Sequence, residues 1–510
     1  MRNVAYFIQA AGKAGEKDFL ALKQQAKKIP EIYSESCHQL ANSFLFLVKE
    51  NTAKKLVVTG DSPLYQELEG KEQSAGDVRF KECPLSEKNS KIIQKYFPFT
   101  RPVPLSKYKT TIGLGDRLGP ASPGHIRLLK KKKIRPVLAQ QSKRELDLTG
   151  RSFRGVLSDA VWAVFQEDYQ EGFGADGDHL KTMAGIKEAL AEGYTMITLD
   201  CSEHIHDLKE TDSGEIDQVY QALPQEKKRA LESRFLGREF TLKSGETLSF
   251  TPDDLRLNVA IYQEAVDFAV HVFQELIAPA AGGVDFEISI DETTTSTHPL
   301  GHFFVAAQLI EAGVKVDSMA PRFCGEFQKG IDYRGDIKEF TREFREHQRI
   351  AEHFGYKLSI HSGSDKFSVF PIIGRESKET FHLKTAGTNW LEAVRVIIQA
   401  EPELYRKIHA FALTRLAEAK KYYHISADPA AVPPVDSLTD EELITLLNKD
   451  DARQIIHITY GEILQARDAG GNYLFRDDIY RCLLENENLY FQFLHDHIGR
   501  HLEMLGFDVN

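Results

Sequence analysis

The middle of the 510-residue chain repeats one pattern, in which a short β-rich run ends in polar residues or glycine and a helical run follows. Strands that alternate with helices predict a parallel sheet covered by helices. The predicted strands are 110–116, 134–141, 172–178, 194–200, 284–291, 314–320, 356–362 and 380–386. A count of eight predicts an α/β fold of the (β/α)8 type, a closed TIM-like barrel.

An open, doubly wound sheet is the main alternative to a barrel. That fold usually carries the fingerprint GxGxxG, which binds a dinucleotide. The nearest match is GLGDRLG at 113–119, where the third glycine comes one position late. The sequence therefore favours the barrel and predicts no NAD cofactor.

The predicted barrel occupies residues 106–400, with further segments before, within and after it. Residues 1–105 begin with a helical run and continue through a short strand, which predicts an N-terminal α/β cap. Residues 201–252 form a polar insertion after the fourth strand. Residues 401–510 have helical periodicity with a Pro- and Ala-rich break, and this C-terminal helical extension could serve as a lid or as the interface of a homo-oligomer.

Composition excludes several classes of protein. The formal net charge of -11 argues against a face that binds nucleic acid. The chain has no window of 18 apolar residues, so no membrane span is expected. Its first residues lack the pattern of a secretion signal, and the five scattered cysteines suit free thiols in a reducing compartment. We expect a cytoplasmic protein that acts on a small molecule.

Polar and ionisable residues gather at the C-terminal ends of the predicted strands. Active sites of (β/α)8 barrels lie at this end, whereas the opposite end serves stability. The residues at these ends are Asp178, His179, Asp200, Asp291, Glu292, Arg322, Glu326, His361, Asp365 and Lys384. Six consecutive strand ends contribute to the set, which a barrel without a site would not need.

The fifth predicted strand alternates apolar and polar residues, so Glu287 and Asp291 point into the barrel. A carboxylate in this position loses water and must be paired, metal-bound or protonated. A purely structural alternative is a buried ion pair with Lys384 or Lys181. Asp176 lies one layer deeper on the third strand, and we interpret it as a buried partner of Lys181.

The stretch FGADGDHLK, residues 173–181, places Asp178 and His179 at the top of the third strand. His179 and His361 form the natural pair of metal ligands. Imidazoles with one or two carboxylates suit Zn, Ni, Co or Mn. No HExxH or CxxC motif joins the ligands locally, so the fold must assemble the site.

Blocks of sequence between residue 152 and about residue 395 are similar to one known family. They are SFRGVLSDAVWAVFQ, GFGADGDHLKT, FEISIDETT with HFFVAAQL, GEFQKGIDY, SIHSGSDKFSVFPIIG and HLKTAGTNWLEA. The chain resembles the tagaturonate epimerases, uronate 4-epimerases that interconvert tagaturonate and fructuronate. The resemblance implies a divalent metal and a ketohexuronate substrate. Some members are similar enough in their pockets to act on fructose and tagatose, so a neutral ketose stays open.

The chemistry of C4 epimerisation limits the mechanism. In a 2-ketose the C4 hydrogen is β to the C2 carbonyl, which does not acidify it. Transient oxidation by NAD would need the missing fingerprint. The remaining route is retro-aldol: the C4 hydroxyl loses its proton, the C3–C4 bond breaks, and the aldehyde rotates and adds again on its other face. This route needs a Lewis acid for the enediolate and a base and an acid on opposite faces.

These requirements lead to a role for each candidate residue. The predicted metal ligands are His179, Glu326 and His361. The predicted catalytic residues are Asp178 as base and Glu287 or Asp291 as acid. The candidates for holding the sugar carboxylate or the developing charge are Lys384, Arg322 and Arg375. A metal-dependent ketose 3-epimerase or isomerase, an aldolase and a non-catalytic sugar-binding barrel remain as alternatives.

Overall fold

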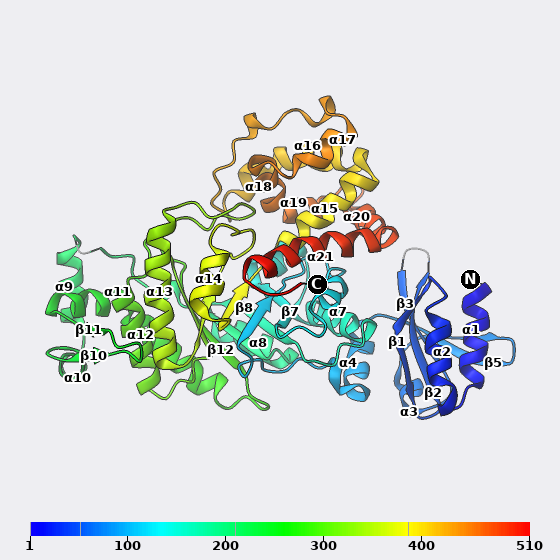
Figure 1. Ribbon diagram of the computed structural model, residues 1–510, viewed down its shortest axis with the longest axis horizontal. Coiled ribbons are helices and arrows are strands. Elements are labelled where there is room, and N and C mark those ends of the chain that lie inside the picture. Colours follow the sequence, from blue (N-terminus) through cyan, green and yellow to red (C-terminus); the bar gives the residue numbers. More distant parts are fainter. Residues whose placement is uncertain (1, 51–52, 210, 386, 510) are drawn as a thin grey trace.

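The computed structural model describes residues 2–50, 53–209, 211–385 and 387–509, and a closed parallel barrel lies at its centre (Figure 1). Neighbouring strands are hydrogen-bonded in the order β12-β13-β14-β15-β6-β7-β8-β9. Their bounds are β6 Thr110–Gly113, β7 Arg135–Ser142, β8 Gly174–Leu180, β9 Met196–Asp200, β12 Asp285–Ile290, β13 Ser318–Pro321, β14 Lys357–Ile360 and β15 Phe381–Lys384. The predicted TIM-like barrel is confirmed. Residues 1, 51–52, 210, 386 and 510, which fall in the predicted segments, lie outside the described residues.

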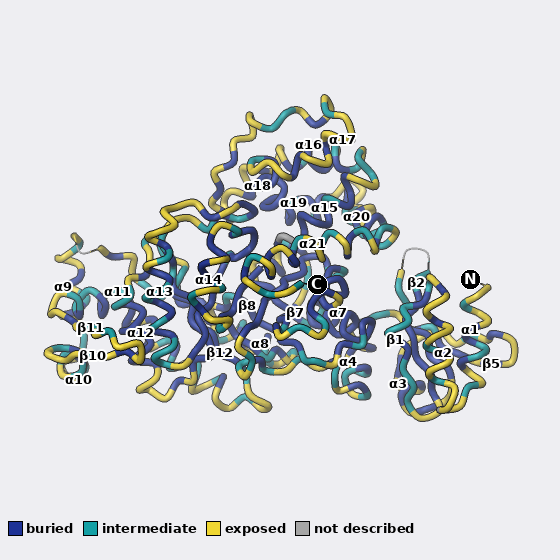
Figure 2. Tube along the Cα trace, viewed as in Figure 1, coloured by how far each residue is buried: buried dark blue, intermediate teal, exposed yellow. Residues whose placement is uncertain are grey.

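The register of the strands brings polar side chains into one inward layer. Glu287 of β12 pairs with Thr198 of β9 and with Ser318 of β13, so the three side chains point into the barrel at the same level. On the other face of β12, Phe286 and Ile288 pack against the surrounding helices. Residues on both faces of the strands are buried, and Figure 2 colours buried residues dark blue.

Helices surround the barrel and link successive strands. They are α5 Ser122–Leu129, α6 Lys143–Thr149, α7 Phe153–Gln166, α8 Met183–Glu192, α11 Pro252–Val272 with η4 Phe273–Ile277, α12 Pro299–Glu311, α13 Ile337–Phe354, α14 Phe370–Ser377 and α15 Thr388–Ala400. Helix α6 begins directly after β7 with a capping box, in which Ser142 and Glu145 satisfy each other's backbone N–H groups. Gly150 then ends the helix in the left-handed conformation.

The N-terminal part is an antiparallel sheet with helices on it, at the right of Figure 1. Its strands run in the order β1-β2-β3-β5-β4. Its elements are α1 Arg2–Lys13, η1 Glu16–Asp18, α2 Phe19–Ala26, β1 Ile32–Leu40, β2 Ser43–Glu50, β3 Ala53–Thr59, α3 Pro63–Glu67, β4 Lys71–Ala75, β5 Val78–Pro84, α4 Glu87–Tyr96 and η2 Pro98–Thr100. An apolar cluster of its own, which includes Phe7, Phe44 and Phe46, packs one face of this sheet against the helices. Its boundary at residue 105 stays a prediction.

The insertion and the C-terminal part complete the chain. Between β9 and α11 lie η3 Ser202–His204, α9 Ser213–Ala222, α10 Gln225–Phe235, β10 Glu239–Thr241 and β11 Thr247–Ser249. After α15 come α16 Pro402–Ala419, η5 Pro429–Ala431, η6 Val435–Ser437, α17 Asp440–Leu446, α18 Asp450–Ile458, α19 Tyr460–Gln465, α20 Arg476–Glu485 and α21 Glu487–Met504. Helix α21 returns across the barrel and packs on α5 and α15 (Figure 1).

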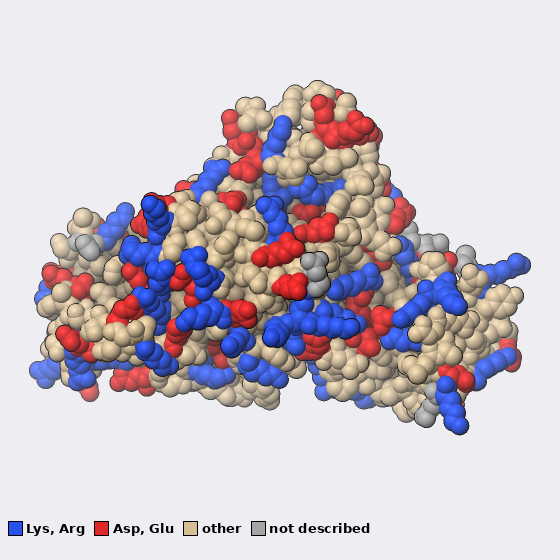
Figure 3. Space-filling view, viewed as in Figure 1, with Lys and Arg blue, Asp and Glu red and all other residues tan. Residues whose placement is uncertain are grey.

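The surface carries both signs of charge. On the face shown in Figure 3, Lys and Arg side chains lie beside Asp and Glu side chains over the barrel helices. Among the described residues, no helix combines the length and the apolar character that crossing a bilayer requires.

Candidate active site

The two histidines predicted as metal ligands lie together at the mouth of the barrel. His179 is near the end of β8 and His361 directly follows β14, with their ring centroids 4.7 Å apart. His179 has φ +52° and Ser362 has φ +48°, a region that side chains of this kind rarely adopt. The β8–β9 pairing also shifts register between Gly177 and Leu180. Backbone strain of this kind collects at functional sites.

Each of these histidines is held by a carboxylate. The Nδ1 atom of His179 lies 2.8 Å from Asp178 Oδ1, and the Nε2 atom of His361 lies 2.8 Å from Glu287 Oε1. A carboxylate that accepts a ring N–H fixes the tautomer and leaves the other nitrogen with its lone pair. The free nitrogens are therefore Nε2 of His179 and Nδ1 of His361.

Asp291 lies against the free nitrogen of His361. Its Oδ2 atom lies 3.1 Å from His361 Nδ1, which is buried and has no hydrogen-bond partner among the described residues. One ligand atom from each of His179, Asp291 and His361 lies within 4.8 Å of the others. Two imidazoles and a carboxylate in this arrangement match a common ligand set for Zn, Mn, Co or Ni.

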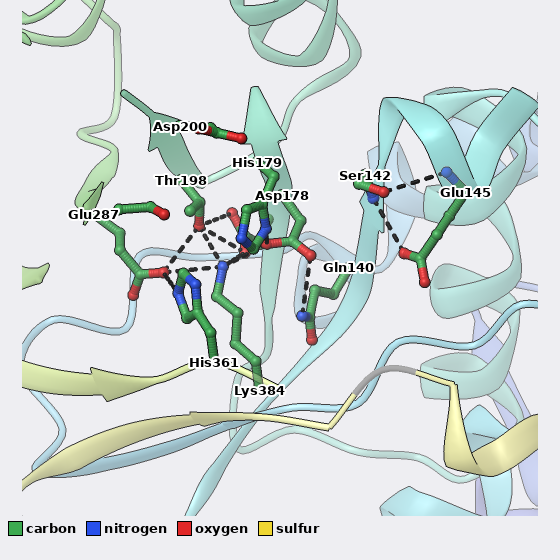
Figure 4. Close-up of polar contacts among 12 residues, drawn as sticks. Gln140, Ser142, Glu145, Asp178, His179, Thr198, Asp200, Glu287, His361 and Lys384 are labelled. Atoms are coloured by element: carbon green, nitrogen blue, oxygen red, sulfur yellow. Dashed lines mark hydrogen bonds and ion pairs between the residues drawn. The ribbon is translucent and has the colours of Figure 1, made fainter. Parts of the chain in front are cut away.

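Lys384 lies below the histidines at the centre of a buried network (Figure 4). Its Nζ atom lies 2.6 Å from Asp178 Oδ1, 2.8 Å from Asp176 Oδ2 and 2.9 Å from Glu287 Oε1. It also donates to the hydroxyl of Thr198. An ammonium has three N–H donors, so Lys384 has none left for a substrate. These contacts argue against Lys384 as the group that holds the sugar carboxylate or the developing charge, and that role stays a prediction. Asp176 pairs with Lys384 and not with Lys181.

The carboxylates in this network outnumber the cations. Asp176, Asp178 and Glu287 share the one ammonium of Lys384, and Asp291 adds a fourth carboxylate beside His361. Burial acts to lower the pKa of His361, but the adjacent Asp291 outweighs it and raises the pKa to about 10. Such a shift means that the site attracts positive charge, either as a proton on the ring or as a bound cation.

The pKa values of the carboxylates follow from the same contacts. Burial acts to raise the pKa of Asp178 and of Glu287, but Lys384 and the neighbouring histidines hold both well below the usual range. Burial raises the pKa of Asp176 to about 6 against the attraction of Lys384, because two other carboxylates share that ammonium. Asp178 is therefore ionised and fully engaged, which makes it a weak base.

Two adjoining cavities open above this network. The inner cavity is lined by Asp178, His179, His361 and Lys384 together with Gln140, Ser142, Glu145, Gly330, Ser364, Lys366 and His457. The outer cavity, of about 340 Å³, is lined by Asp291, Arg322, Glu326 and Phe327 among others. Arg144, Glu292, Lys329, His361, Ser362 and Tyr423 line both, so the cavities form one continuous site. Its outer volume is in the range of small-molecule sites.

The match to known proteins extends over nearly the whole chain. The model of the tagaturonate epimerase family matches residues 33–505. The chain belongs to this family. It is 40% identical over 476 residues to the tagaturonate/fructuronate epimerase of Thermotoga maritima, which covers 93% of this chain and 97% of that protein. The resemblance seen in the sequence blocks is thus confirmed.

Solved structures of a second family member agree in fold. A glycerol complex of the fructuronate-tagaturonate epimerase from Cohnella laeviribosi superposes with a TM-score of 0.90 at 46% identity, covering 96% of this chain and 100% of that one. Its native structure gives the same TM-score and coverage at 45% identity. The barrel and its extensions are therefore shared between two members of the tagaturonate epimerase family.

Three of the residues that we predicted for the site of this chain lie apart from the histidine group. Glu326 and Arg322 line the outer cavity on the segment after β13. The Glu326 carboxylate accepts a hydrogen bond from Gln328, and it is not in the group formed by the two histidines and Asp291. Arg322 donates to the carbonyl of Thr293. Arg375 is exposed on α14 and pairs with Glu376 at 3.0 Å, so the structure does not bring it to the mouth.

Asp365 and Asp200 also end predicted strands but serve the scaffold. Asp365 pairs with Arg453 at 2.9 Å, and its backbone N–H donates to His501 Nε2, which ties the loop after β14 to α18 and α21. Asp200 accepts from the backbone N–H of Ser202 at 2.9 Å. Both carboxylates therefore fix loops around the mouth.

Sequence reasoning missed the residues that line the cavities from other segments. Arg144 lies on α6 directly after β7, and the end of that strand offered the same positional signal as the others. Lys329 is within the block GEFQKGIDY. Tyr423 and His457 come from the C-terminal part, predicted as a lid or an interface, where helical periodicity does not show which side chains reach the barrel mouth.

Proposed function

We propose that this chain interconverts tagaturonate and fructuronate by inverting C4, counted as in a 2-ketose, with a divalent metal at the barrel mouth. The relatives from Thermotoga maritima and Cohnella laeviribosi are both named for these two ketohexuronates. The observation that carries the proposal is the group of His179, Asp291 and His361, in which each histidine is oriented by its own carboxylate.

The donor set fits such a cation. Two neutral imidazoles and one carboxylate leave open positions for substrate oxygens, as catalytic sites of this kind do. The orphaned Nδ1 atom of His361 and the excess of carboxylates are the features that a cation would satisfy. When bound, the metal would supply Lewis-acid stabilisation for negative charge on the sugar oxygens.

Asp178 and Glu287 then act by orienting the histidines. Outer-shell carboxylates of this type fix the ring and raise the basicity of the ligand. Our hypotheses that Asp178 is the base and Glu287 or Asp291 the acid fit this geometry poorly, because all three carboxylates already contact a histidine. Glu292 also approaches a histidine, but its Oε1 atom lies 3.8 Å from His179 Nε2, beyond hydrogen-bond distance, and its side chain is 52% exposed. It lines both cavities, and we propose it as the group that exchanges the proton.

The proposed reaction is retro-aldol cleavage followed by re-addition. Glu292 takes the proton of the C4 hydroxyl, the C3–C4 bond breaks, and its electron pair moves onto the C1–C3 fragment as an enediolate. The C4–C6 aldehyde turns, presents its other face and re-forms the bond, and the proton returns to the C4 oxygen. Atoms and electrons balance without an external oxidant. The inner cavity would exclude bulk water and hold the fragments in place.

One experiment tests both the substrate and the metal. The purified protein is analysed for metal, stripped with a chelator, and incubated with tagaturonate, fructuronate, fructose and tagatose with and without Zn, Mn, Co or Ni. We expect uronate interconversion that disappears on chelation and returns with metal. Full activity in the stripped protein would contradict the metal proposal, and turnover of the neutral ketoses alone would contradict the uronate proposal.

The position of solvent deuterium separates the mechanisms. In D2O, retro-aldol epimerisation need not place deuterium on carbon, whereas 3-epimerisation or aldose formation by deprotonation of C3 does. NMR of the product therefore distinguishes the proposal from a ketose 3-epimerase or isomerase. Accumulation of free three-carbon fragments as the main products would indicate an aldolase.

A further inference from the structure

Four basic side chains line the inner cavity: Arg144, Lys329, Lys366 and Lys384. Two of them have no free donor. Lys384 is surrounded by three carboxylates and Thr198. Lys366 donates to the carbonyls of Gln328, Ile331 and Ser364 at 2.7 to 2.9 Å, which uses its three N–H groups. These two lysines hold the scaffold together.

Lys329 differs from them. Its Nζ atom donates to the hydroxyl of Ser362 at 2.9 Å, and the structure shows no carboxylate within ion-pair distance of it among the described residues. Burial lowers its pKa, since no direct counter-charge compensates for lost water. Two of its three N–H donors remain for a ligand. Ser362 follows His361, so this ammonium lies beside the proposed metal group.

Arg144 is the second cation with spare donors. Its guanidinium donates one long hydrogen bond of 3.4 Å to the carbonyl of Tyr422 and lies 5.0 Å from the ring centroid of Tyr423. The Tyr423 hydroxyl is in turn 3.0 Å from that of Tyr460, so the C-terminal part fixes the ring against which Arg144 rests. No described carboxylate lies within ion-pair distance of Arg144. The paired N–H donors of its guanidinium therefore stay available for bidentate binding of an anion.

Both cations line the inner and the outer cavity, so they lie where the two meet. They come from opposite sides of the mouth, Arg144 from α6 after β7 and Lys329 from the segment between β13 and α13. His361 and Ser362 line both cavities too, so a ligand whose oxygens reach the histidine group also comes within reach of the two cations. The cavity wall therefore offers spare cationic N–H donors beside the metal-ligating side chains.

We infer that Lys329 and Arg144 bind the carboxylate of the ketohexuronate and so select an acid sugar over a neutral one. The inference rests on the proposed function. It also has a consequence for the reaction, because cleavage of C3–C4 leaves the carboxylate on the C4–C6 aldehyde. The same two cations would then keep tartronate semialdehyde in the cavity until it adds again, while the C1–C3 fragment stays at the histidine group.

The test compares Lys329→Met and Arg144→Met with the control Lys143→Met. Lys143 neighbours Arg144 on α6 but is 58% exposed, pairs with Asp147 and lines neither cavity. Each variant is assayed in its metal-loaded form for kcat and KM with tagaturonate and for the Ki of tagatose as a competitive inhibitor. Calorimetry gives the Kd of both sugars, and bound metal is quantified.

We expect each cavity variant to raise KM and Kd for tagaturonate about 10- to 100-fold, the value of a lost charge-assisted hydrogen bond. The Ki of tagatose and the metal content should change less than about threefold, since neither depends on a carboxylate contact. Released dihydroxyacetone should become detectable in the Lys329→Met and Arg144→Met reactions. Lys143→Met should behave as the parent protein, and Arg144→Lys should recover part of the affinity.

Several results would overturn the inference. They are an unchanged tagaturonate KM, an equal loss of tagatose affinity, or a fall in kcat at constant KM, which would make Lys329 a proton donor. A large KM effect of Arg322→Met with none from the two variants would move the carboxylate to Arg322. Because Arg144 is exposed, its truncation tests the inference even if Lys329→Met is unstable. A parent protein without turnover whose tagaturonate binding still depends on Lys329 would reject only the proposed function.

Discussion

Replacement of Lys384 by methionine should lower the stability of the folded barrel, and the loss should be larger at neutral than at acid pH. The substitution keeps most of the side-chain volume but removes the ammonium that Asp176, Asp178 and Glu287 share at 2.6 to 2.9 Å. Removing one partner of a buried ion pair typically costs about 3–5 kcal/mol, because it leaves uncompensated charge in a medium of low polarity. Here three carboxylates lose their counter-charge together, which indicates the upper part of that range.

The pH dependence follows from how the folded protein can relieve this charge. A carboxylate that becomes protonated in the folded state has a folded pKa above its unfolded value of about 3.9. Its contribution to stability is present below the unfolded pKa and is lost as the pH rises toward the folded pKa. Keeping one such carboxylate protonated in the folded state lowers the free energy of unfolding by about 5 kcal/mol at about pH 7.5 and by about 1.5 kcal/mol at about pH 5. Asp176 is the carboxylate most ready to take the proton, since burial already raises its pKa to about 6.

Thermal unfolding of the variant and the parent protein at both pH values measures this difference. At about 2 °C per kcal/mol, we expect the midpoint to fall by about 8–10 °C at neutral pH and by much less at acid pH. Lys181→Met is the control, because that ammonium is 40% exposed and lies 3.7 Å from its partner Asp200. Measurements with chelator and with added metal separate the effect of the lost ammonium on the unfolding midpoint from any effect of lost bound metal. A deficit that equals that of Lys181→Met, or that does not shrink at acid pH, would refute this account of Lys384.

Three further predictions concern the mouth of the barrel. Asp291→Asn should reduce bound metal and turnover together, whereas Glu326→Gln should retain a full metal equivalent. The reason is that the Asp291 carboxylate lies with both histidines and the Glu326 carboxylate does not. Metal analysis of the two variants decides between these ligands, and the reverse result would restore Glu326 as the third ligand. Glu292→Gln should keep its metal but lose about 10²-fold in kcat, and near-normal turnover would remove Glu292 from proton transfer. Asp178→Asn should weaken metal affinity by about 10- to 100-fold by releasing the His179 ring, which a metal titration measures, and unchanged affinity with lost turnover would return Asp178 to the role of base.

Much of the fold could be predicted because it depends on local pattern. The alternation of strands and helices determined eight strands, and the two-residue period of β12 pointed Glu287 and Asp291 inward, where both lie. His179 and His361 could be paired because the strand ends of a parallel barrel meet at one rim. These inferences need only the direction of each strand and the side-chain period.

The partners of these residues could not be predicted in the same way. Which side chains meet across a barrel depends on the stagger with which the sheet closes, and that stagger is a property of all eight strands together. It brings Asp176 of β8 to Lys384 of β15, while the nearer Lys181 turns toward Asp200. The choice between Asp291 and Glu326 depends likewise on the path of the segment after β13, which has no periodicity.

The same reasoning explains why charge at a strand end is a poor guide to the role of a cation. Lys384, Lys366, Lys329 and Arg144 all border the inner cavity, and each carries the same charge in the sequence. Their functions differ through the number of oxygens already bound to each, which is three or more for the first two and one for the last two. A cation whose donors are all used stabilises the fold, and one with donors left over can bind an anion that arrives from solvent. Acceptors for Lys366 and Arg144 are backbone carbonyls brought in by loops and by the C-terminal part. The acid-binding end of the site therefore becomes visible only once the whole chain is folded.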